Sequence, residues 1–130
     1  MTQQEDRAAH SSAFVEMRDR VRAACRTMPE WEEVVDGFGH TTMKVRGKSF
    51  AILGEGAGAA SGPGVSIKAD KETQSLLIAK GPYTRTAYIG QHGWVSIQMA
   101  SIRDWEELRQ LLKEAYMRAA PKKLAEQYRS

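Results

Sequence analysis

The sequence predicts one α+β domain: an antiparallel β-sheet of about five strands, flanked by an N-terminal helix, a middle helix and two C-terminal helices. Apolar residues recur at spacings of three and four near both ends of the chain, which is typical of amphipathic helices. Between them lie short stretches that alternate apolar and polar residues, which indicates strands with one buried face. The length of 130 residues suits one hydrophobic core. We therefore assign residues 1–130 to a single domain, with residues 1–10 as a flexible terminus.

The first two predicted helices have recognisable ends. Apolar residues at helical spacing between Ser11 and Arg26 predict the N-terminal helix, which ends before Pro29. Asp70 can cap the middle helix, and Gly81 follows its last turn at about residue 79, in the order that helix ends favour.

The C-terminal helices have the clearest pattern. Residues 101–104 resemble a capping box in which Asp104 replaces the usual glutamate. The apolar stripe that follows predicts a long helix, which Pro121 ends. A short last helix follows Pro121.

The stretch HTTMKVRGKSF, residues 40–50, predicts a β-hairpin with its tight turn at Arg46 and Gly47. Such a turn pairs Met43 with Phe50 and Lys44 with Ser49. Lys44 and Lys68 then lie on the face of the sheet opposite the core. The residues expected in the core are Met43, Phe50, Ile52, Val65, Ile67, Val95, Ile97, Trp105, Leu108 and Leu112.

Composition and charge restrict the class of protein. The formal net charge is +3, which is compatible with a polyanionic partner, and acids are concentrated at 30–36 and 104–107, away from the predicted strands. No apolar run is long enough to span a membrane, and the polar N-terminus does not resemble a secretory signal, so we expect a cytoplasmic protein with no membrane partner. Cys25 is the one cysteine, and its helical position favours a small buried residue over a reactive thiol.

Two glycine-containing segments resemble nucleotide-binding loops only in part. Residues 46–49 end like a phosphate-binding loop, but Thr42 occupies the place of its first glycine and no helix follows. Gly54–Gly64 has Ala59 where the third glycine of a dinucleotide loop belongs, so we interpret it as a mobile connection that does not bind phosphate. We expect no cofactor.

The sequence contains no catalytic or metal-binding constellation. His10, His40 and His92 have no Cys or His at metal-ligand spacing, so we expect no metal. No Ser-His-Asp order with supporting turns and no Cys-His pair is visible, although the absence of a motif does not exclude an enzyme. The sequence leaves catalysis open and favours a protein without it.

The stretch AYIGQHGW, residues 87–94, is the strongest candidate for a binding element. The rings of Tyr88, His92 and Trp94, placed beside lysines of the polar sheet face, would combine stacking surface with positive charge, as nucleic-acid sites do. A structural role for Trp94 under a terminal helix is the plainer alternative. A small-ligand pocket would instead use His40, Tyr88 and Gln91. The rings of His92 and Trp94 would complete it.

Three stretches, GHTTMKVRGKSFAIL, VSIKAD and PYTRTAYIGQHGWVSIQM, together resemble the MmcQ/YjbR family over roughly residues 11–128. The resemblance implies an α+β domain similar in outline to the frataxin-like fold, and a DNA-binding role with no accepted catalytic activity. Iron binding of the frataxin kind needs an acidic first helix, and here Glu16 and Asp19 alternate with arginines. The positions that match the family pattern are His40, Lys44, Gly47, Lys48, Phe50, Tyr88, Gly90, His92, Gly93 and Trp94.

The leading functional hypothesis is a non-enzymatic module that binds DNA or another polyanion weakly and without sequence preference. It would use the basic sheet face and the hairpin tips as wings. The alternatives are the small-ligand pocket, in an enzyme or a sensor, and a protein-interaction domain whose sheet face receives a partner helix. The residues predicted to contact nucleic acid are Lys44, Arg46, Lys48, Lys68, His92 and Trp94.

Overall fold

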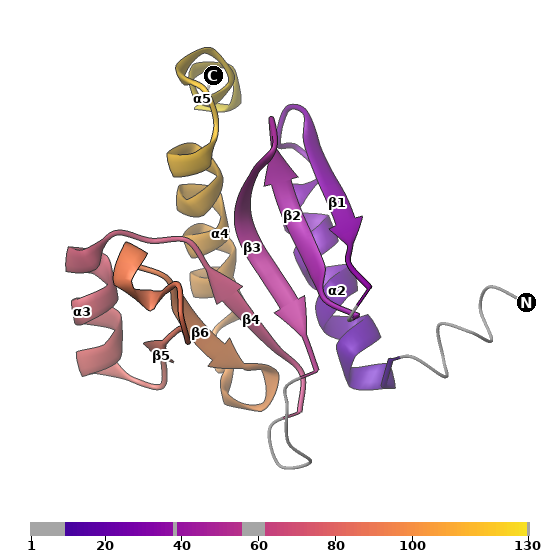
Figure 1. Cartoon of the computed structure of the whole chain (residues 1–130), viewed down its shortest axis with the longest axis vertical. Helices are drawn as coiled ribbons and strands as arrows, with labels where there is room; N and C mark the ends of the chain where they lie inside the picture. The colour runs from indigo at the N-terminus through magenta and orange to yellow at the C-terminus, as the bar shows by residue number, and fades with distance from the viewer. Residues whose placement is uncertain (1–9, 38, 56–61, 130) are drawn as a thin grey trace, which may run out of the picture.

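The structure, a computed structural model, describes residues 10–37, 39–55 and 62–129, and consists of a sheet covered on one face by helices (Figure 1). The strands are β1 Trp31–Val35, β2 Thr41–Val45, β3 Lys48–Gly54, β4 Gly64–Ile67, β5 Thr84–Arg85 and β6 Val95–Gln98. The helices are α2 Ser12–Cys25, α3 Lys71–Lys80, α4 Trp105–Ala119 and α5 Lys122–Arg129, with 3-10 turns η1 Gly90–His92 and η2 Met99–Ser101. The predicted α+β class and helix order are confirmed. The flexible terminus predicted for 1–10 and the mobile connection predicted at Gly54–Gly64 lie largely outside the described residues.

The six strands form one antiparallel sheet in the order β1-β2-β3-β4-β6-β5. The sequence predicted about five strands. The two edges of the observed sheet are β1 and β5, and β5 has only two residues. Helices α2 and α4 cover one face, and α3 lies beside β5 and β6 (Figure 1). We call the face opposite α2 and α4 the open face. Within the described residues, no helix combines the length and the apolar character needed to cross a bilayer.

Helix capping follows the predicted residues with one correction. The Ser11 hydroxyl accepts a hydrogen bond from the Phe14 amide at 3.1 Å, and the Asp70 carboxylate accepts one from the Thr73 amide at 2.7 Å. At α4 the cap is Asp104 itself, which accepts from two amides of the first turn at 3.0 and 3.2 Å. The predicted capping box at 101–104 is therefore wrong, since Ser101 belongs to η2.

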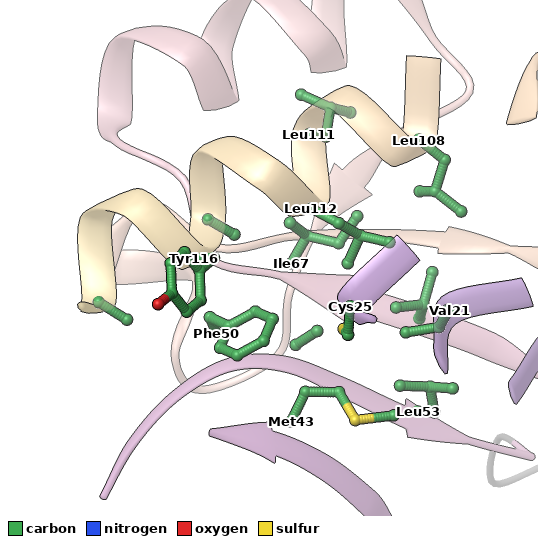
Figure 2. Packing of buried hydrophobic residues seen from close by; sticks show 14 of the residues in the cluster. Val21, Cys25, Met43, Phe50, Leu53, Ile67, Leu108, Leu111, Leu112 and Tyr116 are labelled. Atoms are coloured by element: carbon green, nitrogen blue, oxygen red, sulfur yellow. The ribbon is translucent and has the colours of Figure 1, made fainter. Parts of the chain in front are cut away.

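The core lies between the covered face of the sheet and helices α2 and α4 (Figure 2). Phe50 of β3 and Tyr116 of α4 meet edge to face, with ring centroids 5.7 Å apart, and both are fully buried. The Tyr116 hydroxyl donates to the Pro29 carbonyl at 2.7 Å, so this buried phenol is satisfied. Cys25 is also fully buried, and burial raises the pKa of its thiol to about 12. The expectation of a small buried cysteine is confirmed.

A β-bulge in β3 corrects the predicted strand register. Lys44 pairs with Ser49 as expected, but Met43 pairs with Ala51 instead of Phe50. Phe50 is thus an extra residue, and it and Ala51 are both fully buried. Beyond the bulge the alternation is reversed, so Leu53 enters the core and Ile52, predicted there, lies on the open face.

Trp105 is a second correction to the predicted core, because it is only half-buried at the start of α4. The guanidinium of Arg20, from α2, lies 4.6 Å from the centre of its ring. Trp105 therefore closes the edge of the interface between α2 and α4.

An ion pair fastens β1, at the edge of the sheet, to α2. The Arg22 guanidinium donates two hydrogen bonds to the Glu33 carboxylate, both at 2.6 Å. These bonds hold the pKa of the Glu33 carboxyl below its usual value. The side chain of Glu33 is only 17% exposed, so screening by solvent is incomplete and the pair contributes to stability at neutral pH.

Candidate binding groove on the open face of the sheet

A row of hydroxyl-bearing side chains, interrupted by Ile52, crosses the open face. The strand register aligns Thr42 with Ile52, Ile52 with Ser66, Ser66 with Ser96 and Ser96 with Thr84. Residues directly opposite one another in an antiparallel sheet share a face, so these side chains form one continuous line from β2 to β5.

A groove of about 820 Å³ lies over this row. Its floor contains a chain of hydroxyls: Thr86 to Ser96 at 2.8 Å, and Ser96 to Ser66 at 2.8 Å. One wall comes from residues 82–89 and the other from the start of β2 and the residues before it. The sequence analysis missed these hydroxyls, although the recurrence of Ser and Thr at the outward positions of successive strands was a visible signal.

His40 and Asp36 form one end of the groove. The Asp36 carboxylate accepts from the His40 amide at 2.9 Å, and its second oxygen lies 3.2 Å from Nδ1 of the same residue. The imidazole lies against Gly54, where a Cβ would come within 2.9 Å of its Cδ2. Glycine is needed at this position because the imidazole occupies the space of a side chain. The structure places His40 in the groove wall, as a pocket would require.

Lys44 of β2 lies on the open face, two residues from Thr42, and Lys68 comes directly after β4, two residues from Ser66. Rise along a strand separates them from the hydroxyl row by roughly 7 Å. The ammonium of Lys68 lies 5.9 Å from the centre of the Trp94 ring, close enough for a cation–π contact. Trp94 is 6% exposed, so its ring supports Lys68 more than it offers a surface to a ligand. Among the described residues, neither lysine forms an ion pair.

The hairpin tip presents one arginine that is already paired and one exposed lysine. Arg46 and Gly47 both have positive φ, 50° and 80°, which confirms the predicted tight turn. The Arg46 guanidinium donates to both oxygens of the Glu30 carboxylate, at 2.6 and 3.1 Å, and these bonds lower the pKa of that carboxyl. Lys48 is exposed at the tip.

The motif around residues 87–94 is a compact turn, not a pair of strands. Gly90–His92 forms η1, and Gly93 is left-handed, with the Ala69 carbonyl 2.6 Å from the place of a Cβ. Gln74 of α3 is buried, and its amide nitrogen donates to the Gly90 and Trp94 carbonyls, both at 2.8 Å. This role of Gln74 could not be predicted from local sequence patterns, because the two bonds join residues 16 and 20 positions apart.

Three of the predicted site residues are exposed on this turn, but only one of them lines the groove. Tyr88 is 96% exposed and borders the groove. Gln91 and His92 are exposed on η1, outside the groove lining. The structure therefore brings His40 and Tyr88 to one groove, with Lys44 on the same face and Lys68 directly after β4, and leaves Gln91, Arg46 and Lys48 apart from it.

Comparisons with known proteins agree with this architecture. A crystal structure of Deinococcus radiodurans protein DR2400, described with the family domain DUF419, is similar with a TM-score of 0.64 and 22% sequence identity, over 76% of this chain and 75% of that chain. At this identity the likeness shows the fold alone. No curated protein matches the chain. The family model described as YjbR matches residues 26–118, which include the whole sheet, the groove and nearly all of α4. The chain therefore belongs to the YjbR family.

Proposed function

We propose that this domain binds nucleic acid on the open face of its sheet, without catalysing a reaction. The observation that carries the proposal is the position of Lys44 on β2 and of Lys68 just after β4, each two residues along the chain from a side chain that lines the hydroxyl-bearing groove. Ammonium groups neutralise phosphates, and hydroxyls donate hydrogen bonds to phosphate and sugar oxygens. Lys48 at the hairpin tip would add a third cation at the rim.

The proposed contacts predict weak binding that depends on salt. Two or three lysines neutralise few phosphates, so affinity would start low and its dependence on salt would be modest. Among the residues that the structure describes, no arginine lines the groove that could read the edge of a base with two hydrogen bonds. Arg46 holds Glu30, and Trp94 is buried, so we assign neither a direct contact with the ligand. Sequence preference should accordingly be small.

A salt titration tests the proposal. Fluorescence anisotropy of a labelled single-stranded oligonucleotide would be measured with wild type and with the double variant Lys44→Gln, Lys68→Gln. Loss of two phosphate contacts should reduce the slope of log affinity against log salt by about 1.4 for a single strand. The double variant Lys122→Gln, Lys123→Gln on α5 is the matched control, because it changes net charge equally outside the open face. Equal slopes for both double variants would refute a site on the open face.

The groove favours a second candidate function, the binding of a small molecule. Its volume of about 820 Å³ falls in the range of small-ligand sites, and the pair of Asp36 and His40 supplies polar groups at one end. Amide chemical shifts measured with a panel of small anionic and aromatic compounds would test it. Shifts confined to Thr42, Ser66 and Ser96, in a protein that binds no oligonucleotide, would favour this candidate over the first.

A further inference from the structure

Tyr88 combines a left-handed backbone conformation with an exposed aromatic side chain. It is a non-glycine residue with φ of +66°, in the left-handed region that disfavours a residue with a bulky side chain. Its side chain is 96% exposed, so almost no contact within the protein compensates for the strain or the exposed ring. Strained residues persist where the surrounding structure holds them, and they are concentrated at functional sites.

The surrounding turn fixes the backbone of Tyr88 in this conformation. The Ile89 amide donates to the Ala87 carbonyl at 2.7 Å, and the Gly90 amide donates to the Thr86 carbonyl at 2.9 Å. Gln74 holds the Gly90 carbonyl from α3. The ring of Tyr88 is thus carried by a braced turn at the border of the groove, and a glycine at this position would satisfy the backbone with less strain.

The neighbours of Tyr88 in the groove suit a flat polar ring with an anionic group attached. The groove floor offers the hydroxyls of Ser66 and Ser96, and Lys68 lies two residues beyond Ser66, directly after β4. A nucleotide carries both groups, because its base is a flat polar ring and its phosphate is an anion. A base paired within a duplex is stacked on its neighbours, whereas a base of a single strand can leave the stack and lie against an aromatic side chain.

We infer that Tyr88 is the base-stacking residue of the groove, and that the domain therefore binds single-stranded in preference to double-stranded nucleic acid. This inference rests on the proposed nucleic-acid function and adds to it the strand class and the residue that selects it. Lys44 and Lys68 would hold phosphates of either form, whereas stacking on Tyr88 is open only to an unpaired base.

Three substitutions at one position test the inference. Tyr88→Ala removes the ring and keeps the strain, Tyr88→Gly removes both, and Tyr88→Phe keeps the ring. Affinity for a labelled single-stranded DNA of about ten nucleotides should fall between about 5-fold and 100-fold in the first two variants and stay within about twofold in the third. Affinity for the matching duplex and the salt slope should be unchanged. The matched control is Leu76→Ala, which removes a 65% exposed apolar side chain on α3, outside the groove.

Thermal unfolding of the same variants separates a binding role from a structural one. Tyr88→Gly should have an unchanged or higher Tm, because the strain is relieved and few contacts are lost. A lower Tm for Tyr88→Gly would overturn the inference, since the tyrosine would then serve the fold.

The binding results distinguish failure of the inference from failure of the proposed function. Salt-dependent binding with wild-type affinity in Tyr88→Ala would refute the stacking role and leave the lysine site standing. An equal loss of single-stranded and duplex affinity would also refute stacking on an unpaired base. Absence of binding to either DNA by the wild type would remove the proposed function and the inference together.

Discussion

Replacement of Gln74 by Leu should loosen the turn of residues 90–94, which follows the wall of the groove in the chain. Gln74 is 8% exposed, and its amide nitrogen donates to the carbonyls of Gly90, the first residue of η1, and of Trp94, which follows η1. Leucine has a similar volume and favours the helix equally, so the substitution chiefly removes the two hydrogen bonds. The effect of the substitution therefore measures how much these two bonds between α3 and residues 90–94 stabilise the protein.

The expected loss in free energy of unfolding depends on the hydrogen bonds that each carbonyl keeps after the substitution. The Gly90 carbonyl still accepts from the Gly93 amide at 3.0 Å, and the Trp94 carbonyl still accepts from the Thr86 amide at 3.3 Å. Neither acceptor is left without a partner, so each lost bond should cost about 0.5 to 1.5 kcal/mol. The free energy of unfolding should therefore fall by about 1 to 3 kcal/mol. For a domain of this size that corresponds to a decrease in Tm of roughly 4 to 12 °C.

Urea unfolding and amide hydrogen exchange would measure the effect. Exchange should accelerate at residues 90–94 more than in β2 and β3, because the lost bonds act locally. Ser75→Ala, at the next and exposed position of α3, should change stability by less than about 0.5 kcal/mol and serves as the control. A loss below about 0.5 kcal/mol in Gln74→Leu, with unchanged exchange, would show that Gln74 does not brace the turn.

Two further predictions concern the core and the edge of the sheet. Phe50→Ala should lower the free energy of unfolding by about 3 to 5 kcal/mol, since the ring is fully buried against Tyr116, and a loss below 1 kcal/mol in urea unfolding would contradict the bulged register. Glu33→Gln should destabilise the protein at pH 7, and the difference should narrow as the pH falls below about 4.3, because the pKa of Glu33 is lowered in the folded state and protonation removes the advantage of the pair. Glu32→Gln on the same strand is the charge-matched control, and a difference for Glu33→Gln that stays constant from pH 7 to pH 3 would contradict the stabilising role of the pair with Arg22.

Local patterns predicted the elements because each depends on residues close in sequence. The turn at Arg46 and Gly47 follows from the preference of a hairpin loop for positive φ, and Ser11 and Asp70 cap their helices through amides three residues away. The bulge at Phe50 could not be predicted in this way. It depends on whether Phe50 and Ala51 can both be buried under α4, which only the assembled core decides.

The site was predictable in part for a similar reason. Strand alternation placed Lys44 correctly on the open face, and Lys68 follows the end of β4 with its ammonium over the Trp94 ring. The same alternation put Trp94 among polar residues, but α3 and η1 fold over that end of β6 and bury it. The groove itself joins residues near 40, 66, 88 and 96, and its existence depends on the order of strands in the sheet.

The connection between β4 and β6 belongs to the groove and not to the strand pairs that frame the core. These two strands are antiparallel neighbours, so a turn of a few residues could join them. The chain instead places residues 68–94 between them, with α3, β5 and η1, and this excursion supplies one wall of the groove. Substitutions and length changes within it can alter what the open face recognises while β2, β3, β4 and β6 keep their register. A change confined to this excursion would therefore reshape one wall of the groove without touching the strand pairs that frame the core.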